Sequence, residues 1–194
     1  DLGLLIRKYL RYCESIGMFS RISDIKSKTV EELQNLRHLG FDSISIGTES
    51  GDDNTLARMN KGYTANDIIE QCKKLEEANI RYNFVYLTGL AGRNKGEQNA
   101  VNTANVFNQL HPFTINFVSL TVFPESELYQ EIQCGNFVEA TEHERLLELR
   151  TFISNLCIET TLLGNTASNT GPFVGMIPND KVRILNELDS AIKT

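Results

Sequence analysis

FDSISIGTESG, residues 41–51, joins a short apolar run to a polar turn. Its phenylalanine and isoleucines suit a strand that is largely buried. Directly after the strand, the carboxylate of Glu49 stands between Gly47 and Gly51. Glycine lets the backbone turn sharply and lets a ligand approach closely, and ligands of parallel α/β folds gather where strands end. The stretch therefore predicts an α/β fold with a candidate binding site at the end of this strand.

Similar patterns lie on both sides of this stretch. Further strands are predicted at 80–89 (IRYNFVYLTG) and 113–122 (FTINFVSLTV), and a weaker one at 17–23 (GMFSRIS). Amphipathic helices separate them, and one begins with a capping-box pattern, Thr29 followed by Glu32. Strands that alternate with helices indicate βαβ units and a parallel sheet. The alternation predicts an α/β layered fold or a barrel and does not separate the two.

The pattern changes after Pro124. We expect one helix from Thr141 and another after Asn179, with a loop at 164–178 between them. The sequence thus predicts a strand–helix part at 1–124 and a helical extension at 125–194. The chain also opens inside a helical pattern, which favours a fragment of a longer protein over a processed N-terminus.

Composition excludes several classes of protein. Hydrophobic residues make up 41% and charged residues 23%, as in ordinary globular domains. The net charge of −6 disfavours broad binding to nucleic acid, and no apolar run approaches the roughly 20 residues of a membrane helix. The cysteines are too far apart for a zinc or cluster motif, which suggests reduced thiols and a cytoplasmic protein: they are Cys13, Cys72, Cys134 and Cys157.

A few charged residues could carry chemistry. Glu49 can accept hydrogen bonds from a diol or an amine, and Lys61 offers a cation for a carboxylate or phosphate. The alternative for Glu49 is a turn residue that faces solvent or caps the next helix. Arg21 and Asp24 are either a charged pair in a site or an exposed pair at a helix entry. The loop at 89–96, with three glycines and two cations, either binds an anion or only connects two elements.

The order of these motifs resembles that of the radical SAM superfamily. The likeness is greatest to the branch labelled Fe–S oxidoreductase, related to oxygen-independent coproporphyrinogen oxidases and to the Elp3/MiaB/NifB-type domain. It covers almost the whole chain, and its motifs together are more specific than any one of them. It is carried by residues 19–25 (FSRISDI), 39–51 (LGFDSISIGTESG), 59–62 (MNKG), 87–90 (LTGL), 120–129 (LTVFPESELY), 167–169 (ASN) and 178–193.

The resemblance implies a partial parallel (β/α) barrel, similar to a TIM barrel, of about six units. This chain resembles the last four βα units plus C-terminal helices. The intact enzyme would cleave S-adenosylmethionine (SAM) reductively at a 4Fe–4S cluster, giving a 5′-deoxyadenosyl radical that takes hydrogen from an unknown substrate. The family's Cys-x3-Cys-x2-Cys loop would precede Asp1, and the glycine-rich motif for the SAM amino group is also absent. We therefore expect both cofactors in the intact parent, none bound to this chain, and no activity of this chain alone.

The resemblance also assigns cofactor-binding positions. Glu49 matches a position that contacts SAM with a polar side chain, and Lys61 matches one near the charged or ribose end of SAM. Arg21 falls near a position where other members place a ribose-binding carboxylate. Val85 and Leu87 lie where a later strand passes the adenine, which implies apolar packing there. No catalytic residue and no metal ligand is assigned.

Two other functions remain open at this point. The chain could be a noncatalytic α/β domain that binds a small ligand or a protein, or a complete cluster-independent enzyme that uses Glu49 and Lys61. A truncated barrel would leave the strand at 17–23 as an open edge, which can pair with another chain. We therefore expect the missing N-terminal half of the barrel as a partner, or self-association; a clean monomer at high concentration would contradict the latter.

Overall fold

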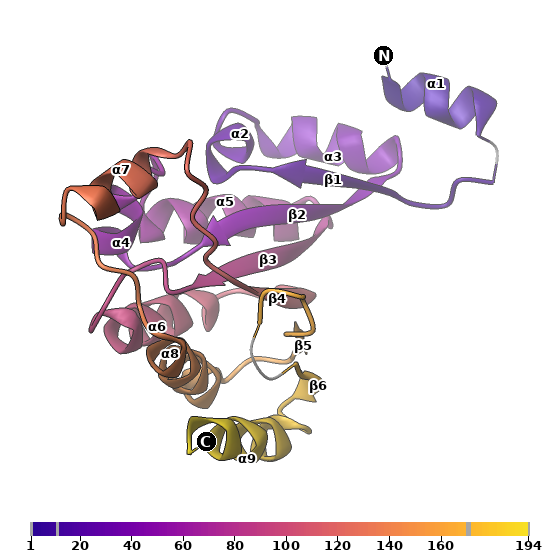
Figure 1. Ribbon diagram of the computed structural model, residues 1–194. Helices are drawn as coiled ribbons and strands as arrows, with labels where there is room; N and C mark the ends of the chain where they lie inside the picture. Colours follow the sequence, from indigo (N-terminus) through magenta and orange to yellow (C-terminus); the bar gives the residue numbers. More distant parts are fainter. Residues whose placement is uncertain (1, 11, 170–171, 194) are drawn as a thin grey trace.

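A six-stranded sheet forms the centre of the structure, a computed structural model that describes residues 2–10, 12–169 and 172–193 (Figure 1). The strands lie in the sheet in the order of the sequence. The first five run parallel to their neighbours, and the sixth is antiparallel to the fifth. They are β1 (Ile16–Ser20), β2 (Phe41–Glu49), β3 (Arg81–Thr88), β4 (Thr114–Ser119), β5 (Thr160–Leu163) and β6 (Val174–Ile177). Sequential parallel strands joined by helices are the arrangement of a (β/α) barrel, so the predicted partial barrel is confirmed.

Helices lie between the first five strands, before β1 and after β6. In chain order they are α1 (Leu2–Tyr9), α2 (Ile22–Lys26), α3 (Val30–His38), α4 (Asp53–Arg58), α5 (Ala65–Glu77), α6 (Gly96–Phe107), α7 (Glu127–Gln133), α8 (Glu142–Asn155) and α9 (Lys181–Ile192). The predicted capping box at Thr29 is present, because its hydroxyl accepts from the Glu32 N–H and its own N–H donates to the Glu32 carboxylate. Within the described residues, no helix has the length and apolar character needed to cross a membrane.

The C-terminal part differs from its prediction. The expected helical extension at 125–194 also contains β5 and β6, and β6 occupies the end of the predicted loop at 164–178, of which residues 170 and 171 lie outside the described residues. Both strands have four residues, too short to show a period of their own, and they form because β4 offers an edge on which β5 can pair. The prediction of a helical extension therefore missed these two strands, while the boundary at residue 124 stays a prediction.

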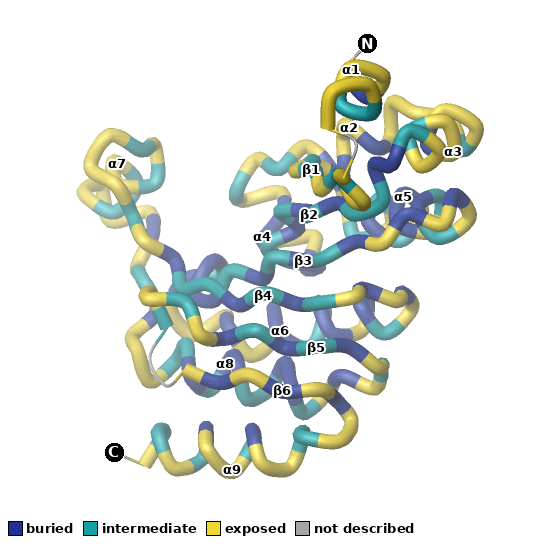
Figure 2. The backbone as a smooth tube through the Cα atoms, turned by 90° about the vertical axis from the view of Figure 1, so that its right-hand side faces the viewer, coloured by how far each residue is buried: buried dark blue, intermediate teal, exposed yellow. Residues whose placement is uncertain are grey.

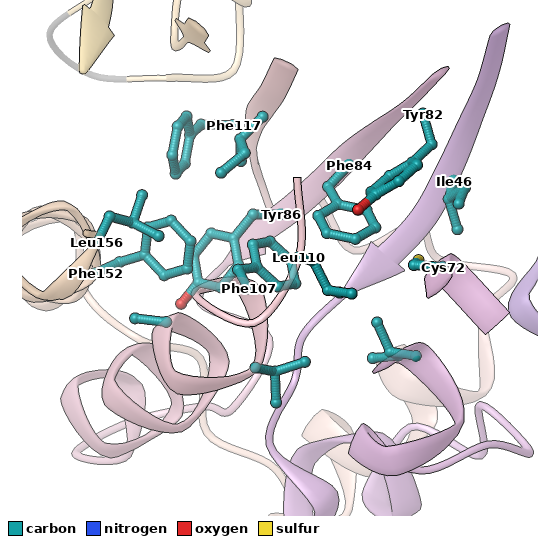
Figure 3. Packing of buried hydrophobic residues seen from close by; sticks show 14 of the residues in the cluster. Ile46, Cys72, Tyr82, Phe84, Tyr86, Phe107, Leu110, Phe117, Phe152 and Leu156 are labelled. Carbon is teal, nitrogen blue, oxygen red and sulfur yellow. The ribbon is translucent and has the colours of Figure 1, made fainter. Parts of the chain in front are cut away.

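One face of the sheet packs against the helices. Along β3, Tyr82, Phe84 and Tyr86 are almost fully buried and alternate with partly buried neighbours, the period expected of a strand. Figure 3 shows these rings among aromatic side chains from the helices. Phe84 lies 4.3 Å from Phe107 of α6, and Tyr86 lies 4.5 Å from Phe152 of α8, both measured between ring centroids. Each such pair adds about 0.5–1.5 kcal/mol beyond the area that it buries, so the aromatic cluster fixes α6 and α8 on the sheet.

The opposite face of the sheet is only partly buried, and Figure 2 shows its residues in teal between the dark blue core positions. Ser45, Asn83 and Thr114 form one row across three strands of this face. The Thr114 hydroxyl donates to Asn83 Oδ1 over 2.9 Å. In a closed barrel this face would line the interior, so we call it the open face.

Candidate functional site

The carboxyl ends of β1 and β2 bring three predicted site residues together. Ser20 pairs with Ile46, which places Arg21 beside the end of β2. Lys61 Nζ lies 2.8 Å from Glu49 Oε2. The two side chains are 14% and 29% exposed, so this ion pair is better shielded from water than a surface pair.

The turn around this ion pair is unusual. Glu49 has a φ of 60°, in the left-handed region that costs a residue with a side chain about 1–2 kcal/mol. Asn60 and Gly62, on both sides of Lys61, also have positive φ. The Lys61 N–H donates to the Leu56 carbonyl oxygen, which fixes the returning turn against α4. Strained backbone of this kind is concentrated at functional sites, so the geometry supports a binding role for the Glu49–Lys61 pair.

Tyr63 is a buried neighbour of Glu49. Its hydroxyl lies 3.1 Å from the carbonyl oxygens of both Gly47 and Thr48, and so braces the end of β2. Burial raises the pKa of Tyr63, the negative charge of Glu49 raises it further, and the positive charge of Arg21 opposes both. Arg21 and Glu49 therefore act on the same buried hydroxyl, one from each strand end.

Arg21 does not form the charged pair with Asp24 that was one of the two predictions. Instead, the Asp24 carboxylate accepts a 2.9 Å hydrogen bond from the Arg21 backbone N–H at the start of α2. Asp24 is thus a helix-entry residue, which leaves the Arg21 side chain exposed above the strand ends.

Val85 and Leu87 lie on the neighbouring strand. Glu49 pairs with Tyr86 across β2 and β3, so Val85 and Leu87 flank its partner residue. Both are partly buried on the open face, and Leu87 packs against the small apolar cluster of Leu90, Leu120 and Phe137. The structure thus places Arg21 and Glu49 at two adjacent strand ends, Lys61 against Glu49, and Val85 and Leu87 on the next strand; their roles toward a cofactor stay predictions.

A buried carboxylate that the sequence did not suggest lies behind this edge. Glu148 of α8 is fully buried. Its Oε1 accepts from the Tyr86 hydroxyl at 2.7 Å and from Asn99 Nδ2 at 2.8 Å, and its Oε2 accepts from the Gly89 N–H at 2.8 Å. Burial raises the pKa of Glu148, while the hydrogen bonds from Tyr86, Gly89 and Asn99 act against that rise.

The same network reaches the turn after β2. The Ser50 hydroxyl donates to Asn99 Oδ1 over 2.6 Å, and the Gly51 N–H donates to Thr103 Oγ1 over 2.8 Å. Gly51 also lies so close to α6 that an added Cβ would be 3.0 Å from the Thr103 Cα. The turns after β2 and β3 are therefore held to each other through α6 and α8. The only signal of this network in the sequence was Glu148 itself, a glutamate among the apolar residues of a helix.

A polar cavity of about 360 Å³ lies where β3 and β4 end. The hydroxyls of Thr88 and Ser119 lie 3.2 Å apart in its wall, and Ser119 donates to Asn169 Oδ1 over 3.1 Å. Arg145 of α8 also lines it and donates to the Leu120 carbonyl oxygen. The cavity stands at the end of the sheet where α/β folds bind ligands.

The described residues give no ligand set for a metal. They contain no group of three histidine, cysteine, aspartate or glutamate side chains that could hold an ion. The four cysteines are free, and they are separated in the fold as in the sequence: Cys72 is buried, Cys13 partly buried, and Cys134 and Cys157 exposed. The donor set of the described residues therefore does not fit an iron–sulfur cluster.

Comparison with known proteins finds a matching family model and a curated relative. The model of the family described as "Radical SAM superfamily" matches residues 3–104, a little over half of the chain. The anaerobic magnesium-protoporphyrin IX monomethyl ester cyclase of Cereibacter sphaeroides is 26% identical over 138 residues, which cover 66% of this chain and 22% of the cyclase.

Solved structures with the same fold include the archaeal Elp3 of Methanocaldococcus infernus, with a TM-score of 0.64 and 14% identity over 92% of this chain and 41% of Elp3. The radical S-adenosylmethionine methyltransferase TsrM of Kitasatospora setae has a TM-score of 0.52 and 18% identity, covering 69% of this chain and 26% of TsrM. At such identities the likeness concerns the fold alone. The chain spans less than half the length of each of these proteins.

Proposed function

This chain belongs to the radical SAM superfamily, and on that premise we propose that it is the C-terminal part of a radical SAM Fe–S oxidoreductase. The observation that carries the proposal is the gathering of Arg21, Glu49 and Lys61 at the carboxyl ends of parallel strands, beside an uncovered sheet face. That edge is where barrel enzymes bind their ligands.

Each residue of the site has a role in this proposal. The Glu49 carboxylate accepts hydrogen bonds from an amine or from ribose hydroxyls, and Lys61 neutralises a ligand carboxylate. Lys61 Nζ lies 2.8 Å from Glu49 Oε2, so the two side chains hold each other in place until a ligand replaces this contact. Val85 and Leu87 supply an apolar surface for a heterocycle, and Arg21 contributes a cation where relatives place a carboxylate.

The cluster belongs to the rest of the parent protein in this proposal. When bound, SAM and a 4Fe–4S cluster supply a 5′-deoxyadenosyl radical that abstracts hydrogen from the substrate. The residues of this chain bind and orient SAM and exclude water from it. The cyclase acts, by its name, on a magnesium porphyrin ester, but this chain spans 22% of it, so the substrate is left unassigned. The net charge of −6 argues against nucleic acid, and the free cysteines suit the cytoplasm.

The proposal is tested on the protein encoded together with its upstream reading frame. Purified without oxygen and supplied with iron and sulfide, it is expected to show the visible absorption of an iron–sulfur cluster and to form 5′-deoxyadenosine from SAM. Replacing Glu49 or Lys61 by alanine should weaken SAM binding by about tenfold, because each removes a charge-assisted hydrogen bond.

Affinity is measured by equilibrium dialysis, so that this readout does not depend on turnover. Glu31→Ala, an exposed carboxylate of α3, serves as the control and should bind SAM as the wild type does. An upstream frame without a cysteine motif, or a protein that binds no SAM, would favour a noncatalytic α/β domain instead.

We also propose that the chain, when expressed alone, associates through β1. This strand is an edge of the sheet, its Phe19 is 91% exposed, and the nearby helix α1 exposes apolar residues such as Leu2 and Tyr9. A second copy or the remaining half of the barrel can pair with such an edge. Sedimentation equilibrium should show dimers or larger species that Phe19→Lys suppresses and that Phe123→Lys, at another exposed phenylalanine, does not. A monomer at millimolar concentration would contradict this.

A further inference from the structure

A basic groove lies at the turn after β3. Two cavities, of about 310 and 320 Å³, share Arg58, Ala91, Asn94 and Lys95 in their walls. Arg93 lines one of them as well. We call this pair of cavities the basic groove. Ala91, in the wall of both cavities, follows the last residue of β3 by three positions.

Two of its three cations have no hydrogen-bonded or ion-paired partner among the described residues, although the charge of Arg93 acts on Glu144. In the described part of the chain, the side chains of Arg93 and Lys95 make neither a hydrogen bond nor an ion pair. Arg58 is fixed, since its Nη2 lies 2.7 Å from Glu131 Oε2 and its guanidinium lies 5.9 Å from the Phe137 ring centroid. The groove therefore combines one positioned cation, Arg58, with two cations, Arg93 and Lys95, whose N–H groups are available to a ligand.

Two carboxylates at the groove, Asp52 and Glu144, already accept hydrogen bonds from other groups. Asp52 accepts from the Thr55 N–H and hydroxyl and from Asn102 Nδ2. Burial alone would raise the pKa of Asp52, but these hydrogen bonds hold it below its ordinary value. Glu144 caps α8 at Thr141 and accepts from the Asn94 N–H, and these bonds, with a smaller contribution from the charge of Arg93, lower its pKa. Asp52 and Glu144 thus serve helix ends and turns and Glu131 pairs with Arg58, so the N–H groups of Arg93 and Lys95 are left for a further acceptor.

Neutral donors surround Arg93 and Lys95. The amide side chains of Asn54, Asn94, Gln98 and Asn136 line the two cavities. Amide N–H groups beside guanidinium and ammonium groups form a surface that prefers an acceptor with several oxygens. Such a surface stands out in a chain with a net charge of −6.

We propose that the basic groove binds an oxyanion, the phosphate or carboxylate group of a small ligand, through Arg93, Lys95 and Arg58. This site differs from the Glu49–Lys61 pair, which lies at the end of β2. Oxyanion binding at this site requires neither a cluster nor SAM, so its test is independent of the test of the proposed function.

The test is a titration of the 194-residue chain, labelled with nitrogen-15, by sodium pyrophosphate and, separately, by sodium succinate. Saturable shifts are expected for the backbone amides of residues 91–96 and 136–138, with sodium chloride at equal ionic strength as the reference. Arg93→Gln with Lys95→Gln should weaken binding by about tenfold or more, because two charge-assisted contacts are lost. Both residues are exposed, so this double variant should keep its urea midpoint.

A matched double variant, Lys28→Gln with Lys73→Gln, removes the same charge from two exposed positions outside the groove. It should bind as the wild type does. Saturation by pyrophosphate alone would identify a phosphate site, and saturation by succinate would identify a carboxylate site; either supports the proposal. Absence of saturable shifts with both anions, or equal weakening in the two double variants, would overturn it.

Discussion

Glu148→Leu is expected to lower the free energy of unfolding by about 3–5 kcal/mol, as removal of one partner of a buried charged network does. The substitution fills the site with an apolar side chain but removes the acceptor of three buried donors, the Tyr86 hydroxyl, Asn99 Nδ2 and the Gly89 N–H. Each donor left without a partner costs about 1–3 kcal/mol. Urea unfolding followed by circular dichroism measures the loss.

Glu31→Leu on α3 provides the control, because Glu31 is exposed and its replacement should change stability by less than about 0.5 kcal/mol. A loss below about 1 kcal/mol for Glu148→Leu would mean that water or a rearranged Asn99 replaces the carboxylate, and that the network does not hold the two turns.

The same carboxylate gives stability a definite dependence on pH. Burial raises the pKa of Glu148 in the folded state above its ordinary value, which applies to the unfolded chain. Between these two pKa values the native state binds the additional proton, so this contribution to stability falls as pH rises through that window. Below this window Glu148 is protonated in both the folded and the unfolded state. Above it Glu148 is ionised in both states, and the free-energy cost of burying the charged carboxylate no longer changes with pH. Glu148→Gln should lack this fall, and the difference between the two stability–pH curves isolates it.

The elements that the sequence predicted are those fixed by local chemistry. The capping box of Thr29 with Glu32 depends on residues three positions apart, and it formed as expected. The strands β1 to β4 have runs long enough to show a buried pattern. By contrast, β5 and β6 exist because β4 offers an edge to which β5 can pair, and no pattern within four residues reports a pairing partner that is distant in sequence.

The candidate site was likewise predictable only in part. The Glu49–Lys61 pair was expected because strand ends and glycine turns are visible in sequence. The network of Glu148 was not, since its partners Tyr86 and Asn99 are 62 and 49 residues away. Only the structure shows whether Asp24 forms an ion pair with Arg21 or caps a helix. The reason is that a carboxylate at this position of a turn can accept a hydrogen bond either from a backbone N–H or from a neighbouring cation.

Phe152→Ala is expected to cost about 3–5 kcal/mol, the range for removing a large aromatic side chain from a core. Phe152 is fully buried, stacks on Tyr86 with 4.5 Å between ring centroids, and meets Phe107 and Phe117 edge-on. Because Phe152 lies one helical turn beyond Glu148 on α8, it holds the face of the helix that presents the carboxylate to Tyr86.

Loss of this ring should therefore loosen the carboxylate network as well as the core. We expect the double variant Phe152→Ala with Glu148→Leu to lose at least about 1 kcal/mol less than the sum of the single variants, since residues that share a partner do not act additively. Phe123→Ala, which removes a 64% exposed ring, should leave stability within about 0.5 kcal/mol. Strict additivity in the urea measurements would show that Tyr86 serves the core and the network independently, and that α8 carries no coupling between the sheet and the turns after β2 and β3.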